Sequence, residues 1–244
     1  MRTGPLCDVV ILCGGLGTRL RSVVSDRPKP MAMVHDRPFL AFVVEQLVRS
    51  GFQRLIFCTG YKGEWITRYF QDTQGYDAIF SDEPEPLGTA GAIKHCRSFL
   101  RTSTFLVVNG DSFCAVDVSG LLEAHHRADV LITMAVVRSD GRTDGGSVVL
   151  DEHGRIARFQ EKGVSGFHLN SGIYACSAGL LNHIPDRRPS SLEHDVFPSL
   201  PATSLYGFVT PEPLYDIGTP ERLEAFRLFS AERLVHWTEE RTTC

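Results

Sequence analysis

The sequence predicts an α/β protein of three layers, in which a mixed, mainly parallel central sheet carries helices on both faces. Three observations support this fold class. Residues 8–13, DVVILC, form a short apolar run typical of a buried parallel strand, and two glycines follow it directly. Apolar strand segments then alternate with helical segments as far as Asp111, which is typical of a parallel sheet. After Asp111 the pattern becomes mixed and partly antiparallel.

Each expected element has its own local signal. A helix begins behind Asp36 and Pro38 and ends at Gly51, with apolar residues at helical spacing between them. The first half also predicts strands at 54–59, 76–81 and 104–109 and helices at 64–70 and 89–96. The second half predicts a helix near 121–128, a strand at 130–137, a hairpin of 147–150 with 155–160, and a closing amphipathic helix from 221 to about 237. We expect one domain, 1–244, of two lobes, 1–112 and 113–244, the second covering the carboxyl edge of the first sheet.

Length and composition exclude several classes of protein. With 244 residues, 43% of them hydrophobic, the chain can bury a core without disulfides. The seven cysteines include no C-x-x-C pair, which argues against a zinc site and favours buried thiols. The net charge of −4 disfavours a nucleic-acid partner. No segment approaches the roughly 20 apolar residues of a membrane span, and the start lacks the layout of a secretion signal, so we expect a cytoplasmic protein without a membrane partner.

The strongest local signal is the segment GGLGTRL at 14–20, directly after the first strand, followed by PKPM at 28–31. Glycines let backbone N–H groups approach a polyphosphate, and Arg19 and Lys29 can neutralise it. A dinucleotide-binding fingerprint would need a third glycine where Leu20 stands, and no G-K-[ST] sequence of a P-loop occurs. A tight turn with two solvated cations is the alternative.

These residues resemble the sugar-1-phosphate nucleotidyltransferases, whose opening pattern is G-G-x-G-T-R-L followed by P-K-P-M. The resemblance continues in the family's order over almost the whole chain, through PLGTAG at 86–91, NGD at 109–111, EK at 161–162, NSG at 170–172, SLE at 191–193 and DIGTP at 216–220. Around Phe39 and at 83–91 and 191–198 the sequence is most similar to the D-glycero-α-D-manno-heptose 1-phosphate guanylyltransferases. The implied fold is Rossmann-like, with the nucleotide at the carboxyl edge of the sheet and a small sugar-binding lobe.

The resemblance implies that a sugar 1-phosphate oxygen displaces pyrophosphate at the α-phosphate of a nucleoside triphosphate. A phosphate monoester is already largely ionised at neutral pH, so this reaction needs no general base. It needs fixed cations and a metal that stabilise charge on the transferring group. By resemblance Asp111 and Asp216 hold Mg²⁺, although an Asp after a strand is often only a turn or cap residue.

The other roles carried over by resemblance are those of catalytic cations and of ligands to each substrate. Arg19 would hold the departing pyrophosphate, Lys29 the α-phosphate and Lys162 the sugar phosphate. The nucleotide would contact Leu12, Gly14, Gly15, Gly17, Thr18, Glu83, Pro86, Leu87, Gly88 and Thr89. The sugar phosphate would contact Asn109, Gly110, Gly146, Glu161, Lys162, Asn170, Gly172 and Glu193, of which Glu193 could instead be a helix cap.

Base and sugar selection are separate questions. A carboxylate at Glu83 accepts from both the N1–H and the 2-amino group of guanine, so we expect GTP, with Glu85 as the second candidate and plain loop solvation as the alternative. Relatives often carry Tyr-Gly where this chain has Gly145-Gly146, which could make room for the seventh carbon of a heptose or only add loop flexibility. Mannose 1-phosphate, or another hexose 1-phosphate with UTP or dTTP, is the alternative substrate.

Two other classes of protein are less compatible with the sequence. A sugar-nucleotide sensor without activity would be expected to lose a metal ligand or a cation, yet Arg19, Lys29, Asp111, Lys162 and Asp216 are all present. A glycosyltransferase typically carries Asp-x-Asp, whereas Phe113 stands at the second position here. The sequence leaves open whether two copies form a homodimer through 120–137 or through the final helix.

Overall fold

The computed structural model describes residues 7–15, 20, 24–139, 141, 145–160 and 167–242, with side chains in the last helix as far as Ala231. The strands are β1 (Asp8–Leu12), β2 (Met33–Val34), β3 (Arg37–Pro38), β4 (Arg54–Thr59), β5 (Asp77–Asp82), β6 (Thr104–Asn109), β7 (Ser112–Cys114), β8 (Ile132–Arg138), β9 (Ser147–Leu150), β10 (Ile156–Gln160), β11 (His168–Ser177), β12 (Leu205–Thr210) and β13 (Leu214–Asp216). The α-helices are α1 (Phe39–Arg49), α2 (Glu64–Phe70), α3 (Gly88–His95), α4 (Val118–Ala128) and α5 (Pro220–Thr242).

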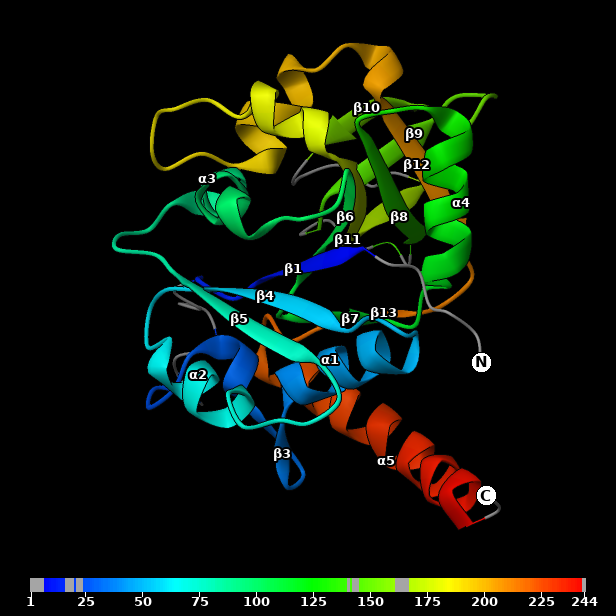
Figure 1. Ribbon diagram of the computed structural model, residues 1–244. Coiled ribbons are helices and arrows are strands. Elements are labelled where there is room, and N and C mark those ends of the chain that lie inside the picture. The colour runs from blue at the N-terminus through cyan, green and yellow to red at the C-terminus, as the bar shows by residue number, and fades with distance from the viewer. Residues whose placement is uncertain are drawn as a thin grey trace.

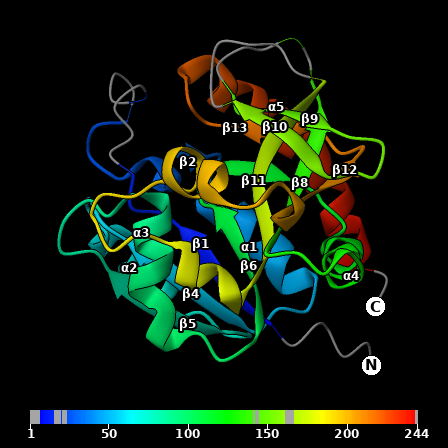
Figure 2. The same ribbon diagram turned by 90° about the horizontal axis from the view of Figure 1, so that it is seen from above.

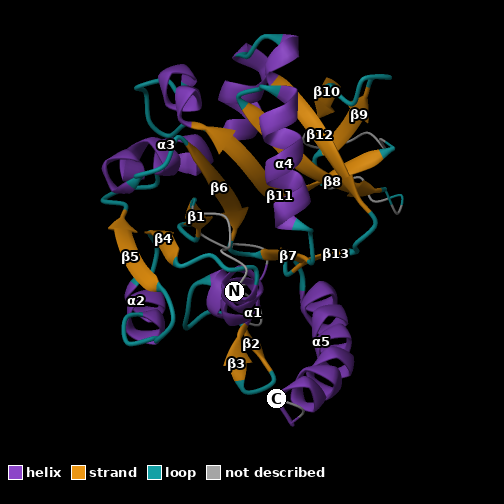
Figure 3. Cartoon of the chain, turned by 45° about the vertical axis from the view of Figure 1, so that its right-hand side comes forward, coloured by secondary structure: helices purple, strands orange, loops and turns teal. Residues whose placement is uncertain are grey.

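Within the described chain one mixed sheet of nine strands runs through both halves (Figures 1 and 3). Its order is β10-β9-β11-β6-β1-β4-β5, and β8 pairs with both β11 and β12. Strands β6, β1, β4 and β5 are parallel, whereas β11 joins β6 in the antiparallel direction. The predicted mixed α/β fold is therefore confirmed.

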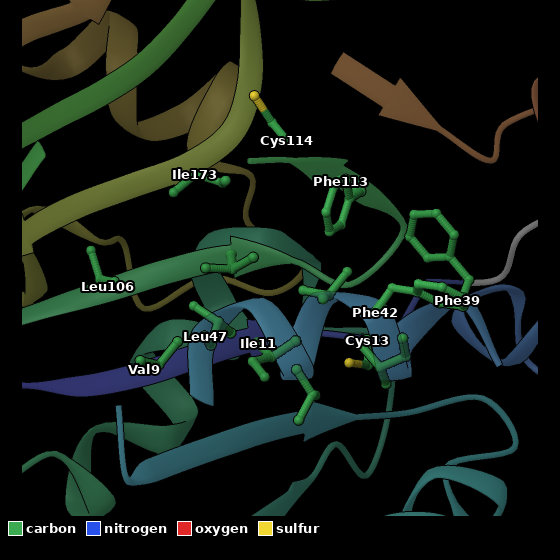
Figure 4. Packing of buried hydrophobic residues seen from close by; sticks show 14 of the residues in the cluster. Val9, Ile11, Cys13, Phe39, Phe42, Leu47, Leu106, Phe113, Cys114 and Ile173 are labelled. Carbon is green, nitrogen blue, oxygen red and sulfur yellow. The ribbon is translucent and has the colours of Figure 1, made fainter. Parts of the chain in front are cut away.

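Alternation along the strands divides the core between the two faces of the sheet. Val9 and Ile11 belong to a cluster that also contains apolar residues of α1, α2, α4 and α5. Figure 4 shows part of this cluster, in which Phe39 and Phe42 of α1 lie near Phe113. Val10 points to the opposite face, where the cluster includes residues of α3 and of the short helical turns between 178 and 200. Figure 2 shows the sheet from above, with α3 and these turns in front of its strands.

The start of α1 differs from the prediction. We expected Asp36 to cap the helix, but residues 33–38 form a tight hairpin of β2 and β3, with His35 at a positive φ of 55°. The helix begins at Phe39, and Pro38 is its N-cap residue. No side chain caps the start of this helix. Instead, the backbone N–H of Phe39 donates to the carbonyl of Ala32 at 2.9 Å.

The second half also differs from the expected cover over the first sheet. Its strands β8, β9, β10, β11 and β12 extend the same sheet sideways, and it is β13 that reaches the carboxyl end by pairing with β7. The sequence pattern predicted the hairpin of β9 and β10 but not β11, β12 or β7. In β11 the polar triplet at 170–172 interrupts the apolar pattern, and hydrogen bonds to β6 and β8 supply the pairing that the pattern does not reveal.

Two further expectations concern thiols and membranes. Cys13, Cys58, Cys96, Cys114 and Cys176 are buried and free of disulfides, as predicted. Cys7 is also free but only half-buried, and the prediction for Cys244 falls outside the described residues. In the part of the chain that the structure describes, no helix combines the length and the apolar character needed to cross a membrane.

Candidate active site

Two adjoining cavities open at the carboxyl ends of β1, β5 and β6, with volumes of about 400 and 470 Å³. Both are lined by Lys29, Gly88, Thr89, Asn109 and Asp111. The first cavity is completed by Leu12, Cys13, Gly14, Gly15, Leu20, Pro30, Glu83, Pro86, Ala92 and Gly218. The second is completed by Ser112, Gly145, Gly146, Phe159, Leu169, Asn170, Ser171, Gly172, Ser191, Glu193, Leu214, Asp216 and Arg222. The parallel strands therefore bring most of the predicted site residues to one edge of the sheet.

Glu83 places a carboxylate in the first cavity, directly after β5. Its Oε2 accepts from the backbone N–H of Leu87 at 3.2 Å. Burial raises the pKa of Glu83, and the Leu87 hydrogen bond partly offsets this rise. A Cβ at Gly14 would lie 2.5 Å from Oε1 of Glu83, so only glycine at this position leaves the carboxylate in place.

The N-terminus of α3 is bound to the segment at 190–193. Gly88 has a positive φ of 75°, and a Cβ there would lie 2.3 Å from the carbonyl oxygen of Ser190. Thr89 Oγ1 donates to Glu193 Oε2 at 2.9 Å and accepts from the N–H of Leu192 at 2.8 Å. Ser191 Oγ donates to the same Glu193 oxygen at 2.7 Å. Two motifs that are distant in sequence thus form one wall, and Glu193 faces the second cavity instead of acting only as a cap.

Lys29 and Asp111 form an ion pair where the two cavities meet. Lys29 begins the 3₁₀ turn Lys29–Met31, and Asp111 follows β6. The distance from Lys29 Nζ to Asp111 Oδ2 is 2.7 Å, and the Lys29 side chain is only 12% exposed. A fixed ammonium at this point can neutralise an anionic ligand that bridges the cavities.

Asp216 reaches the same end of the sheet through β13. Its register partner in β7 is Ser112, and the N–H of Ile217 donates to the carbonyl of Asp111 at 3.1 Å. The two carboxylates predicted as metal ligands are therefore brought together by backbone pairing. Arg222, in the first turn of α5, donates from Nη1 to both carboxylate oxygens of Asp216 at 3.0 Å.

The far wall of the second cavity is built from β11 and the segment before β9. Asn170 Nδ2 donates to the hydroxyl of the buried Tyr174 at 2.7 Å, and its Oδ1 accepts from the N–H of Gly172 at 2.9 Å. Gly172 has a positive φ of 78°, and a Cβ would lie 2.6 Å from Asn109 Nδ2. A Cβ at Gly146 would lie 2.9 Å from the Phe159 ring. Both glycines are required because neighbouring side chains occupy the space.

Some predicted residues lie elsewhere. Leu87 is fully buried and Gly110 packs against Cys13, so neither lines a cavity. The residues on either side of each of them do line a cavity. The predictions for Gly17, Thr18, Arg19, Glu161 and Lys162 fall outside the described residues.

Sequence reasoning missed Arg222 and Ser191 as lining residues. Arg222 stands six positions after Asp216, at the start of the predicted helix, and that spacing was the available signal. One arginine at this spacing does not stand out in the sequence, because the chain contains 21 arginines among 25 basic residues.

The donor set of Asp111 and Asp216 fits Mg²⁺. Both side chains offer only carboxylate oxygens, which Mg²⁺ prefers, and Mg²⁺ is commonly held by one or two carboxylates together with substrate phosphates. In the described ranges no group of three or more His, Cys, Asp and Glu side chains converges into a self-sufficient metal site. The pair of carboxylates therefore suits a metal that is completed by a phosphate ligand.

The fold and the two cavities define an α/β protein whose carboxyl sheet edge is suited to anionic ligands. Comparison with known proteins shows the family to which the chain belongs. The chain belongs to the nucleotidyl transferase family, which matches residues 8–232.

Individual relatives are similar over most of the chain. It is 36% identical over 216 residues to the D-glycero-α-D-manno-heptose 1-phosphate guanylyltransferase of Campylobacter jejuni, covering 88% of this chain and 96% of that protein. It is 35% identical to the mannose-1-phosphate guanylyltransferase of Mycobacterium tuberculosis, covering 88% of this chain and 62% of that protein. The crystal structure of HddC from Yersinia pseudotuberculosis matches with a TM-score of 0.81 and 35% identity, covering 91% of this chain and all of that one.

Proposed function

We propose that this enzyme joins GTP and D-glycero-α-D-manno-heptose 1-phosphate to form GDP-heptose, with release of pyrophosphate. The heptose 1-phosphate guanylyltransferases of Campylobacter jejuni and Aneurinibacillus thermoaerophilus match over 96% and 94% of their own lengths, at 36% and 34% identity. The HddC structure complexed with GMP-PN matches with a TM-score of 0.80 and 35% identity over 90% of this chain and 97% of that one. These relatives have the size of this chain as well as its sequence pattern.

In the proposed reaction a phosphate oxygen of the sugar 1-phosphate forms a bond to the α-phosphorus of GTP, and the bond from that phosphorus to the oxygen bridging the β-phosphate breaks. The negative charge leaves with pyrophosphate, so no side chain has to accept a proton. Lys29 lies where the two cavities meet and would hold the α-phosphate between them. Asp111 and Asp216 would hold Mg²⁺, which when bound would neutralise phosphate charge and align the reacting groups.

The observation that carries the choice of base is the Glu83 carboxylate in the first cavity. Its position is defined by the Leu87 N–H and by the absence of a side chain at Gly14. A carboxylate only accepts hydrogen bonds, and guanine offers two adjacent donors along one edge. Uracil and thymine offer a single donor between acceptors, which would leave the carboxylate facing an acceptor. Glu85 is exposed and lines neither cavity, so Glu83 is the stronger candidate.

Mannose 1-phosphate is the second candidate substrate because the Mycobacterium tuberculosis mannose-1-phosphate guanylyltransferase is 35% identical to this chain. This chain spans only 62% of that relative, whereas it spans nearly all of the heptose enzymes. Gly145, where relatives often carry tyrosine, lines the second cavity without a side chain, which supports the larger sugar.

A crossed assay tests the proposal. The purified protein is incubated with Mg²⁺ and each of GTP, ATP, CTP, UTP and dTTP, combined in turn with heptose, mannose and glucose 1-phosphates. Pyrophosphate and the mass of the nucleotide sugar are both measured. We expect turnover with GTP and the heptose 1-phosphate. Turnover with a different pair would overturn the assignment of base or sugar, and no pyrophosphate with any pair would overturn the proposed activity.

A further inference from the structure

Arg222 is a basic side chain in the second cavity that the sequence motifs do not assign. It lies in the first turn of α5, and its side chain is 28% exposed. In the described part of the chain, the lysine and arginine side chains that line the two cavities are Lys29 and Arg222. Lys29 borders both cavities, whereas Arg222 borders only the second.

The charges of the described residues around the second cavity favour a cation beside a bound phosphate. Its described lining carries three carboxylates, Asp111, Glu193 and Asp216, against two basic groups. A sugar 1-phosphate brings a further charge of about −2 at neutral pH. Lys29 already forms an ion pair with Asp111, and it lies where the two cavities meet. Lys162, to which the family resemblance assigns the sugar phosphate, lies outside the described residues. Among the described residues that line this cavity, Arg222 is the cation placed on the side of β13 and α5, where it could bind the same phosphate.

The partner of Arg222 strengthens this argument. Its guanidinium is bound to Asp216, a carboxylate that fits Mg²⁺. A divalent cation held by that carboxylate would repel the guanidinium, whose charge could then be balanced by an anion. A planar guanidinium with five N–H donors matches the oxygens of a phosphate, which a lysine matches only as a point charge.

We propose that Arg222 binds the phosphate group of the sugar 1-phosphate, an assignment that rests on the proposed function of this site. The alternative is that Arg222 only positions Asp216. The two roles predict different effects, because a phosphate ligand acts on one substrate, whereas a counter-ion of Asp216 acts on the metal.

The test compares Arg222→Ala and Arg222→Lys with the wild type, using GTP and whichever sugar 1-phosphate the wild type turns over. KM is measured separately for GTP and for the sugar 1-phosphate. Calorimetry gives the affinity for the sugar 1-phosphate without turnover, and Mn²⁺ spin resonance gives the affinity of the protein with GTP for a divalent cation. Arg227→Ala is the matched control, since Arg227 lies on the same helix outside both cavities. Its guanidinium donates to the Glu224 carboxylate and to the carbonyl of Met33.

In Arg222→Ala we expect KM and the calorimetric Kd for the sugar 1-phosphate to rise about 10- to 100-fold, with KM for GTP and Mn²⁺ affinity within about threefold of wild type. Arg222→Lys should recover part of the loss, and it also serves as the test if the alanine variant fails to fold. Unchanged sugar 1-phosphate affinity, or an equal loss for GTP, sugar and Mn²⁺, would overturn the proposal. Turnover of mannose 1-phosphate in place of heptose 1-phosphate would sink the proposed function alone, because the comparison of Arg222 variants then runs with mannose 1-phosphate.

Discussion

Glu83 and Gly14 form a matched pair at the residue scale. The carboxylate is partly buried and its pKa is raised by that burial, so its charged form is maintained by a limited set of contacts. One of these is the Leu87 N–H at 3.2 Å. The other requirement is space, because a Cβ on Gly14 would lie within 2.5 Å of Oε1. The proposed base-selecting carboxylate is thus held by one backbone donor and by the space that Gly14 leaves.

Glu83→Gln should weaken the preference for GTP. The amide keeps the size of the side chain but turns one acceptor into an N–H donor, which would oppose a donor of guanine. We expect kcat/KM for GTP to fall about 10- to 100-fold, while UTP and dTTP change little. Steady-state kinetics with the three nucleotides measure this, and the exposed Glu85→Gln is the matched control. Full retention of GTP preference in Glu83→Gln would refute the role of Glu83.

Gly14→Ala tests the same contact from the opposite side. The added methyl group displaces the Glu83 carboxylate, so we expect a loss of GTP preference similar to that of Glu83→Gln. In a Glu83→Ala background the methyl group has no carboxylate to displace, and the second substitution should add little, which is the signature of coupled residues. Fully additive effects in this double-mutant cycle would show that Gly14 acts independently of Glu83.

At the scale of elements, α5 links the site to the core. Phe226 is fully buried and its ring centroid lies 4.6 Å from that of Phe39 and 5.4 Å from that of Phe113. Tyr215, next to Asp216, stacks on Phe229 with centroids 4.2 Å apart. The cluster joins α1, β7, β13 and α5, and it therefore determines where Asp216 and Arg222 stand.

Phe226→Ala should destabilise the protein strongly. Loss of a fully buried phenylalanine that contacts several rings costs about 3–5 kcal/mol of unfolding free energy. The matched control is Leu228→Ala on the same helix, since Leu228 is 65% exposed and should change the unfolding free energy by less than about 0.5 kcal/mol. Urea unfolding curves measure both variants. Equal stability of the two variants would contradict the role of the cluster.

At the scale of the whole molecule, His125 joins α4 to the sheet. Its Nδ1 lies 3.1 Å from Thr133 Oγ1 in β8, and its Nε2 lies 3.0 Å from Ser177 Oγ in β11. Burial, together with the neighbouring charge of His126, lowers the pKa of His125 from 6.5 to about 4, and Asp129 opposes the shift. The folded chain therefore holds this histidine neutral at pH values where an unfolded chain would protonate it.

This difference predicts how global stability depends on pH. Between pH 6.5 and about 4 the unfolded state binds a proton at His125 that the folded state does not, so the free energy of unfolding falls as the pH falls through this window. Above pH 6.5 both states are neutral at His125 and its contribution is constant. Urea unfolding at pH 7 and pH 5 should show a larger loss in the wild type than in His125→Gln. The exposed His183→Gln should lose as much as the wild type, and an identical loss in all three proteins would contradict the assignment.

The order of the motifs was readable from the sequence because each motif follows an element with a strong local pattern. Residues 54–59, 64–70 and 104–109 form the predicted elements with the predicted bounds, since continuous apolar runs and helical spacing are properties of neighbouring residues. The sequence also allowed us to predict that Gly14, Glu83 and Asp111 meet at one edge of the sheet, because the carboxyl ends of parallel strands share one edge. β11 could not be found in this way, since its central place depends on partners far along the chain.

The sequence by itself determined the alternation of strands and helices, the glycines that bring backbone close to a ligand, and the identity of the carboxylates and of Lys29. Only the tertiary structure decided which charges meet. Lys29 and Asp111 are 82 positions apart, and Arg222 became a site residue because β13 pairs with β7 and positions the first turn of α5. Local patterns act between neighbours in sequence, whereas an ion pair depends on distance in space. That distance is set by strand register and by the aromatic packing of α5.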